Sequence, residues 1–154
     1  MTVKTKFYNW QKPKKAHVLK FRKESPNLVG LKNWLVKRYG GQSLGIYQKR
    51  EIRGGGAPST HSFGAALDWR YPTRVAAKQV MKFLIANSEE LGVQAVHDYV
   101  GQCIWHAGRG WKKQEPDAFG MGQAWATWIH IEVVPSAWAD KRPIADKVGV
   151  ANLP

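Results

Sequence analysis

The sequence has a single cysteine and no long hydrophobic run, and each scarcity excludes a class of protein. Only Cys103 carries a thiol among 154 residues, so the fold cannot depend on an internal disulfide or on an oxidising compartment. No run reaches the length of a membrane span, and the opening residues MTVKTKFYNWQKPKK lack the apolar core of a secretory signal. We therefore expect a protein made in a cytoplasm without a signal peptide and with no membrane insertion.

Acidic residues are scarce in the first third of the chain. Residues 1–53 hold 14 of the 24 Lys and Arg residues but only two acidic residues, Glu24 and Glu51, so most of the net charge of +13 lies there. This asymmetry favours an anionic partner such as nucleic acid, a membrane surface or a cell wall, or else it is simply a solvated basic face. Nucleic acid is the weakest candidate, because no nucleic-acid-binding motif accompanies the charge.

Two segments have the pattern of helices. Ser25 is a candidate cap with Pro26 at the first helical position, and that helix should stop at the Gly40-Gly41 pair. A second helix is predicted over residues 73–92, with Thr73 as its cap and a glycine break at its end.

The remaining periodicity predicts strands. Residues 44–50, 63–71 and 126–134 have strand patterns, and residues 93–111 alternate as a hairpin would. We predict one α+β domain over residues 1–154, with a small, mainly antiparallel sheet, two or three helices and an irregular tail from Pro135. The basic arm of residues 1–24 is either ordered or a loose leader, and the sequence does not decide between them.

The segment STHSFGAALDWR, residues 59–70, places His61 and Asp68 with six residues between them. The two side chains would lie about 10 Å apart along a helix and over about 20 Å apart along a strand, so neither structure brings both to one metal ion. A tight turn that enters a strand would do so, and Gly64 with its neighbouring alanines permits such a turn. Otherwise His61 is an ordinary loop histidine and Asp68 caps a turn.

A second histidine is predicted to join them. The period of two in TWIHIEV places Trp128, His130 and Glu132 on one face of a strand, with the aliphatic residues on the other. Alone, His130 would be interpreted as an ordinary core histidine. With His61 and Asp68, it completes a set of two histidines and one carboxylate that leaves a fourth position open, as in catalytic zinc sites.

These residues resemble a known family. The pattern SxHxxGxAxD is matched by Ser59, His61, Gly64, Ala66 and Asp68, and with a later strand histidine it resembles the D-alanyl-D-alanine carboxypeptidase and L-alanyl-D-glutamate endopeptidase family of zinc peptidases. The similarity extends over residues 44–134 and includes RGGGAPS upstream and IWHAGRGWKK downstream. Many members of this family are phage lysins or cell-wall enzymes.

The resemblance implies a function and a site. One zinc ion would be held by His61, Asp68 and His130, and the protein would hydrolyse amide bonds in the peptide stems or crosslinks of bacterial peptidoglycan. It would be a phage-encoded monomer that reaches the wall through lysis of the host or as part of the virion. Arg53, or else Arg50, would hold a substrate carboxylate, with Ser59 as a further substrate-binding candidate; alternatively both arginines belong to the general basic face.

The sequence departs from the family at the catalytic base. Relatives usually carry an acidic residue three positions before the last ligand, whereas this chain has Thr127, which cannot accept the proton. Asp98, His97 and His106 on the predicted hairpin are candidate replacements, and so is Glu132, although it more naturally supports a ligand. The alternative is a wall-binding or phage-tail module that retains the metal with little or no catalysis.

Overall fold

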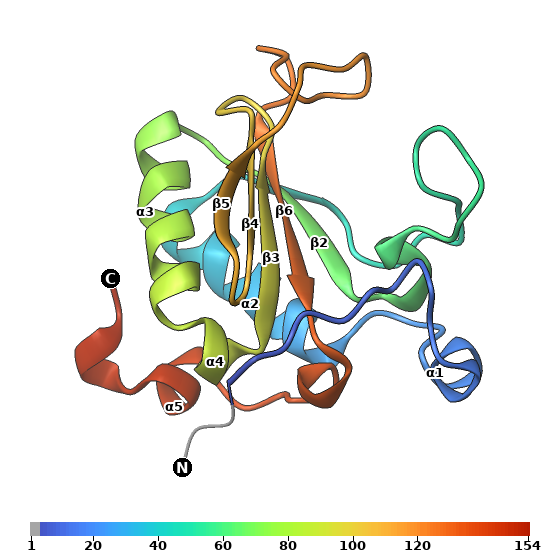
Figure 1. The fold of residues 1–154 in the computed structure, drawn as a ribbon. Coiled ribbons are helices and arrows are strands. Elements are labelled where there is room, and N and C mark those ends of the chain that lie inside the picture. Colours follow the sequence, from blue (N-terminus) through green and yellow to red (C-terminus); the bar gives the residue numbers. More distant parts are fainter. Residues whose placement is uncertain (1–3) are drawn as a thin grey trace.

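Six antiparallel strands form one sheet in the computed structural model, which describes residues 4–154 (Figure 1). Their order across the sheet is β1-β2-β6-β3-β4-β5. The strands are β1 (Gln42–Gly45), β2 (Ala66–Arg70), β3 (Val93–Asp98), β4 (Cys103–His106), β5 (Gly110–Lys113) and β6 (Trp128–Val133). The predicted α+β class with a mainly antiparallel sheet is confirmed.

The strand predictions are correct in place but not always in extent. β2 and β6 lie within the predicted segments, and the predicted hairpin is a three-stranded meander of β3, β4 and β5. The strand predicted over 44–50 instead ends at Gly45, where a bulge and a positive φ of 129° turn the chain out of the sheet. Beyond it, Gln48 donates its backbone N–H to the carbonyl of His61, so this segment runs beside the site.

The two long helices begin where the sequence places their caps. The Ser25 hydroxyl accepts from the N–H of Leu28 at the start of α2 (Pro26–Tyr39), and Thr73 does the same for α3 (Arg74–Ala86). The second helix was predicted to reach Gly92, but it ends at Ala86 because Asn87 leaves helical geometry and bonds back to the carbonyl of Phe83. The shorter helices are α1 (Lys15–Lys20), α4 (Ser88–Leu91), α5 (Ile144–Val148), η1 (Thr60–Phe63), η2 (Pro135–Ala137) and η3 (Val150–Asn152).

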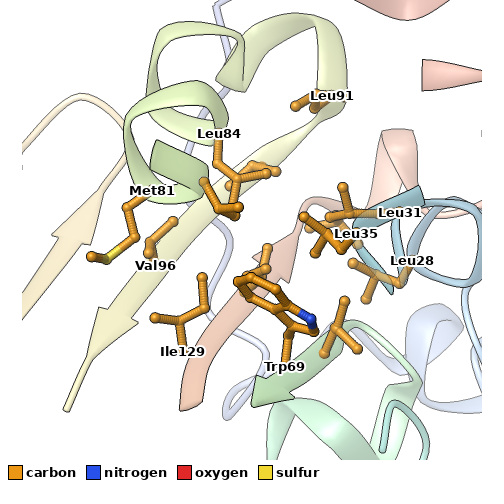
Figure 2. Packing of buried hydrophobic residues seen from close by; sticks show 14 of the residues in the cluster. Leu28, Leu31, Leu35, Trp69, Met81, Leu84, Leu91, Val96 and Ile129 are labelled. Carbon is orange, nitrogen blue, oxygen red and sulfur yellow. The ribbon is translucent and has the colours of Figure 1, made fainter. Parts of the chain in front are cut away.

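The helices α2 and α3 pack on one face of the sheet. Figure 2 shows the indole of Trp69 among the leucines of α2, with Leu84 of α3 and the strand residues Val96 and Ile129 nearby. Trp69 is fully buried in this cluster. The opposite face of the central strands is thereby left for polar side chains.

The basic arm is an ordered part of the fold from residue 4 onward. Trp10 and Phe21 are 1% and 3% exposed, and the indole N–H of Trp10 donates to the carbonyl of Val133 on β6. In Figure 1 this blue segment crosses the lower part of the sheet and leads to α1. The arm therefore belongs to the core rather than forming a loose leader.

The tail from Pro135 also differs from the irregular segment that was expected. It contains the short helices η2, α5 and η3, and it buries Trp138, whose indole donates to the carbonyl of Phe63. No helix in the described part of the chain combines the length and the apolar surface that crossing a membrane requires.

Candidate metal centre

A tight turn closes the gap between His61 and Asp68, as the spacing predicted. His61 lies in η1, where the Ser59 hydroxyl accepts from its N–H at 3.3 Å, and Asp68 lies two residues into β2. Gly64 ends η1 with a φ of 60°, and a side chain there would collide with the backbone carbonyl of Lys23. Only glycine fits both the left-handed conformation and this close approach.

Strand register brings the other polar residues beside Asp68. Asp68 on β2 is paired with His130 on β6, and His130 is paired with His97 on β3. Residues directly opposite in an antiparallel sheet share a face. The three side chains therefore form a row across the sheet, on the face away from α2 and α3.

The three predicted ligands lie within reach of one ion. Nε2 of His61 is 3.2 Å from Oδ2 of Asp68, and Nδ1 of His130 is 2.9 Å from Oδ1 of the same carboxylate. The candidate ligand atoms of these three residues all lie within 4.8 Å of one another, and both histidines are buried. The structure thus confirms that the sequence motif assembles a group that could hold a metal ion.

His61 gives the clearest sign of such an ion. Its Nδ1 lies 2.8 Å from the carbonyl of Ile46, which can only accept, so Nδ1 carries a proton and Nε2 is the ring nitrogen left to bind a proton or a metal ion. Nε2 lies 3.2 Å from Oδ2 of Asp68, yet the pair lacks the geometry of a hydrogen bond, and this buried nitrogen has no hydrogen-bond partner among the described residues. Two electron-rich atoms this close require a cation between them, either a proton or a metal ion.

A polar network orients His130 from its other side. Nε2 of His130 donates to Oε1 of Glu132 at 3.0 Å, and the hydroxyl of Thr60 donates to the same oxygen at 2.9 Å. The second oxygen of Glu132 accepts from Gln94 at 3.0 Å. A carboxylate that holds the far nitrogen of a ligating histidine fixes the ring and strengthens it as a ligand.

His97, His130 and Glu132 form a second grouping that could hold a metal ion. Glu132, however, already accepts hydrogen bonds on both oxygens, so an ion there would displace an established partner. The ring of His97 lies against that of His130, with 4.5 Å between their centroids. This arrangement favours the set of His61, Asp68 and His130, with Glu132 as the support of His130.

The electrostatics of the metal-free site follow from this network. Burial disfavours the charged form of His130, but its hydrogen bonds to Asp68 and Glu132 outweigh this and raise its pKa to about 9. Burial likewise opposes ionisation of the two carboxylates, but His130 outweighs it at Glu132, whose pKa falls to about 2, and His130 together with His61 outweighs it at Asp68, whose pKa lies below its usual range. Burial first, and then the charge of His130, lower the pKa of His97 to about 3, so His97 is neutral.

Two of the candidate bases lie away from the ligands. Asp98 is next to His97 in sequence but faces the opposite side of β3, where Arg74 of α3 donates to both of its oxygens at 2.8 and 2.5 Å. His106 lies on β4, where its ring packs against that of Phe7 in a tilted arrangement, with 4.4 Å between the centroids. Neither Asp98 nor His106 lines the cavity over the metal ligands, so the expectation that they border it is wrong. Asp98 faces the other side of the sheet, whereas His106 shares the face of the ligands but lies opposite Ala95, one strand further from Asp68 than His97.

The predicted substrate-binding residues do border that cavity. It has a volume of about 130 Å³ and is lined by Gln11, Arg50, Ile52, Arg53, Ser59, Thr60, His61, Asp68, His97, Tyr99, His130 and Glu132. The Arg53 guanidinium lies over the Trp128 ring, 5.8 Å from its centroid. Both candidate arginines therefore place positive charge at the rim of the cavity, whose floor holds the two carboxylates.

Four lining residues were missed by sequence reasoning. Gln11 comes from the arm, Thr60 from η1, Tyr99 from the turn after β3, and Ile52 from the loop after β1. Sequence reasoning also missed Gln94, which does not line the cavity but donates a hydrogen bond to Glu132. A period of two along VQAVHD would have separated His97 from Asp98, but no local pattern places the arm over the sheet.

No family model, no curated protein and no solved structure matches this chain. Membership of the zinc peptidase family therefore stays a prediction, and the assignment of the site depends on its own geometry.

Proposed function

We propose that the protein is a zinc peptidase that hydrolyses amide bonds in the peptides of bacterial peptidoglycan. The observation that carries the proposal is Nε2 of His61, which is buried without a hydrogen-bond partner among the described residues and lies 3.2 Å from the Asp68 carboxylate that Nδ1 of His130 also contacts. A ligand set of two histidines and one carboxylate with an open fourth position is typical of catalytic zinc.

The spacing of the ligand atoms supports zinc as the ion. Ligand atoms around a tetrahedral zinc ion lie about 3.3 Å apart, since each bond is about 2.0 Å long. The separations of 3.2 Å from His61 to Oδ2 of Asp68 and 2.9 Å from His130 to Oδ1 of Asp68 are close to that value, each at a different oxygen of the carboxylate. Calcium and magnesium prefer sites made of oxygen atoms, which this set with two imidazoles is not.

The chain's own residues define what each part of the site would do. Zinc in such a site supplies a Lewis acid that activates water and polarises a scissile carbonyl. Arg50 and Arg53 at the rim would hold a substrate carboxylate, for which a guanidinium offers two parallel donors. Tyr99 would donate its hydroxyl proton in a hydrogen bond to the reacting carbonyl, because burial raises its pKa above the usual range and keeps it protonated.

The proton acceptor is the weakest part of this machinery. Asp68 and Glu132 are the only carboxylates among the described residues that line the cavity, and one is a ligand while the other has both oxygens occupied. Thr127 stands where relatives of the resembled family carry the base. We therefore expect slow turnover by the wild-type protein, with Glu132 taking the proton only after it releases Thr60 or His130.

A second candidate function follows from the same observation. A module that binds the cell wall or belongs to a phage tail would retain the zinc site for structure, and the occupied Glu132 favours it. Both candidates place a monomer at peptidoglycan, encoded by a phage and delivered through lysis or in the virion.

Digestion of purified peptidoglycan separates the two candidates. Zinc-loaded wild-type protein is compared with His61→Ala, and the released fragments are identified by mass, with Glu115→Gln on an exposed loop as the matched surface control. A peptidase releases defined fragments that the His61 variant does not release. Zinc binding with no fragments from several wall types would contradict the peptidase and leave the binding module.

A further inference from the structure

A larger groove lies beside the metal-site cavity. Its volume is about 720 Å³, and it is lined by Pro13, Val18, Arg22, Tyr47, Lys49, Arg50, Glu51, Gly56, Ala57, Pro58, Ser62 and Phe63. One wall is the arm with α1, and the other is the loop between β1 and η1. Arg50 lines both this groove and the cavity over the metal ligands, so the two spaces adjoin.

The groove is built into the fold rather than formed by a loose loop. The hydroxyl of Ser62 donates to the carbonyl of Arg50 and accepts from the Arg50 N–H at 3.1 Å, which joins the loop to η1. Arg22 is held by a bond from its Nε to the carbonyl of Val18. The opposing walls are therefore anchored in α1 and η1.

The charges of the groove favour a ligand with carboxylates. Arg22, Lys49 and Arg50 contribute three cations against the single carboxylate of Glu51. Nε of Arg50 donates to Gln48 at 2.9 Å, while its two terminal nitrogens have no protein partner within residues 4–154. A guanidinium in this state can bind a carboxylate through two parallel hydrogen bonds.

The apolar part of the groove's lining restricts the class of ligand further. Half of the groove consists of aliphatic and aromatic side chains, including Val18, Tyr47 and Phe63. A polymer with a charge on every unit, such as nucleic acid, would leave the apolar half of the groove without a matching partner. Its negative charges would also be repelled by Glu51. A peptide that alternates small aliphatic and acidic residues matches both parts.

We infer that this groove binds an acidic peptide segment on one side of the scissile bond, with Arg22 and Lys49 holding carboxylates beyond the position reached by Arg50. The inference rests on the proposed function, because it assigns the groove to the uncleaved part of the same substrate. It places substrate selection in the arm and the loop between β1 and η1, outside the zinc ligands.

The test measures binding without cleavage. The probe is a fluorescent peptide, Ala-Glu-Ala-Ala-Glu-Ala, and its counterpart with Gln in place of Glu, titrated by polarisation into the zinc-loaded protein and into His61→Ala. We expect the acidic peptide to bind about tenfold more tightly than the Gln peptide. Arg22→Gln with Lys49→Gln should remove this preference, while the matched pair Lys37→Gln with Lys78→Gln, on exposed positions of α2 and α3, should keep it.

The outcomes separate the groove from the peptidase. If a protein that takes up zinc binds the two peptides equally, the proposed role of the groove is contradicted while the proposed function stands. A preference for the acidic peptide in a protein that neither binds zinc nor cleaves peptidoglycan supports the groove and overturns the function. Salt-sensitive binding of a short DNA duplex, lost in the Arg22 and Lys49 variant when neither peptide binds, overturns the acidic peptide in favour of nucleic acid.

Discussion

At the scale of single residues, two contacts of His61 explain why the site favours a metal ion. The carbonyl of Ile46 fixes a proton on Nδ1, and Oδ2 of Asp68 lies 3.2 Å from Nε2. His130 differs, since without metal both of its nitrogens donate to carboxylates. Metal binding should therefore replace one proton on His130 and fill a gap already present at His61.

Zinc binding should depend on pH through His130. Its pKa of about 9 means that the metal-free ring is doubly protonated at neutral pH, so zinc must displace a proton. We predict that affinity rises about tenfold per pH unit between about pH 6 and pH 8. Titration calorimetry in buffers of different ionisation enthalpy measures the released proton, and affinity that is independent of pH would contradict this role of His130.

The raised pKa of His130 also makes the stability of the metal-free protein depend on pH. Because the folded state raises the pKa of His130 above its ordinary value of 6.5, the stabilisation is complete below that pH and is lost as the pH rises through about 9.

Glu132→Gln should weaken zinc binding without unfolding the protein. The substitution removes the charge that orients His130 and leaves an amide N–H facing donors from Thr60 or Gln94. Loss of such support typically lowers metal affinity about 10- to 100-fold. Competition with a chromogenic chelator measures the change, with Glu115→Gln as the exposed control, and unchanged affinity would exclude a supporting role.

At the scale of secondary-structure elements, the sequence predicts which residues share a face of a strand more reliably than it predicts which strands lie side by side. The alternation in TWIHIEV correctly places His130 and Glu132 together, and the glycine in the motif correctly predicts the turn after His61. The pairing of β3 with β6 depends on contacts distant in sequence, so the contact of His97 with His130 could not be predicted, whereas the period of two along β3 already separates Asp98 from the face of His97.

Asp98 links β3 to α3, and its substitution should lower the stability of the fold without changing zinc binding. Asp98→Asn breaks the paired bonds from Arg74 and weakens the bond from the N–H of Gly101. We predict a loss of about 2 kcal/mol in the free energy of unfolding, measured with urea. Zinc affinity and any peptidoglycan cleavage should be unchanged, and a selective loss of cleavage would restore Asp98 as a catalytic base.

At the scale of the whole molecule, the charge asymmetry and the core overlap in one segment. The arm carries much of the positive charge, yet it also supplies Trp10 and Phe21 to the core and Gln11 to the site cavity. The sequence showed the charge but not the burial, because aromatic residues within a basic segment suit either a core or a binding groove. The arm therefore both stabilises the fold and shapes the site.

Trp10→Ala should destabilise the entire domain. The side chain is 1% exposed, stacks on Phe63 with 5.3 Å between ring centroids and bonds to β6. Removing a buried tryptophan typically costs about 3–5 kcal/mol, whereas Trp125→Ala, at a position 57% exposed, should cost under about 1 kcal/mol. Thermal unfolding compares the two, and similar melting temperatures would show that the arm is dispensable to the fold.

The most direct test of the central claim is the zinc content of the purified protein after loading and removal of free metal. We predict one zinc ion per chain for the wild type, and none retained by His61→Ala or Asp68→Asn when both variants have the circular dichroism of the folded protein. A folded wild type that retains no zinc, or a His61 variant that retains a full equivalent, would contradict the site.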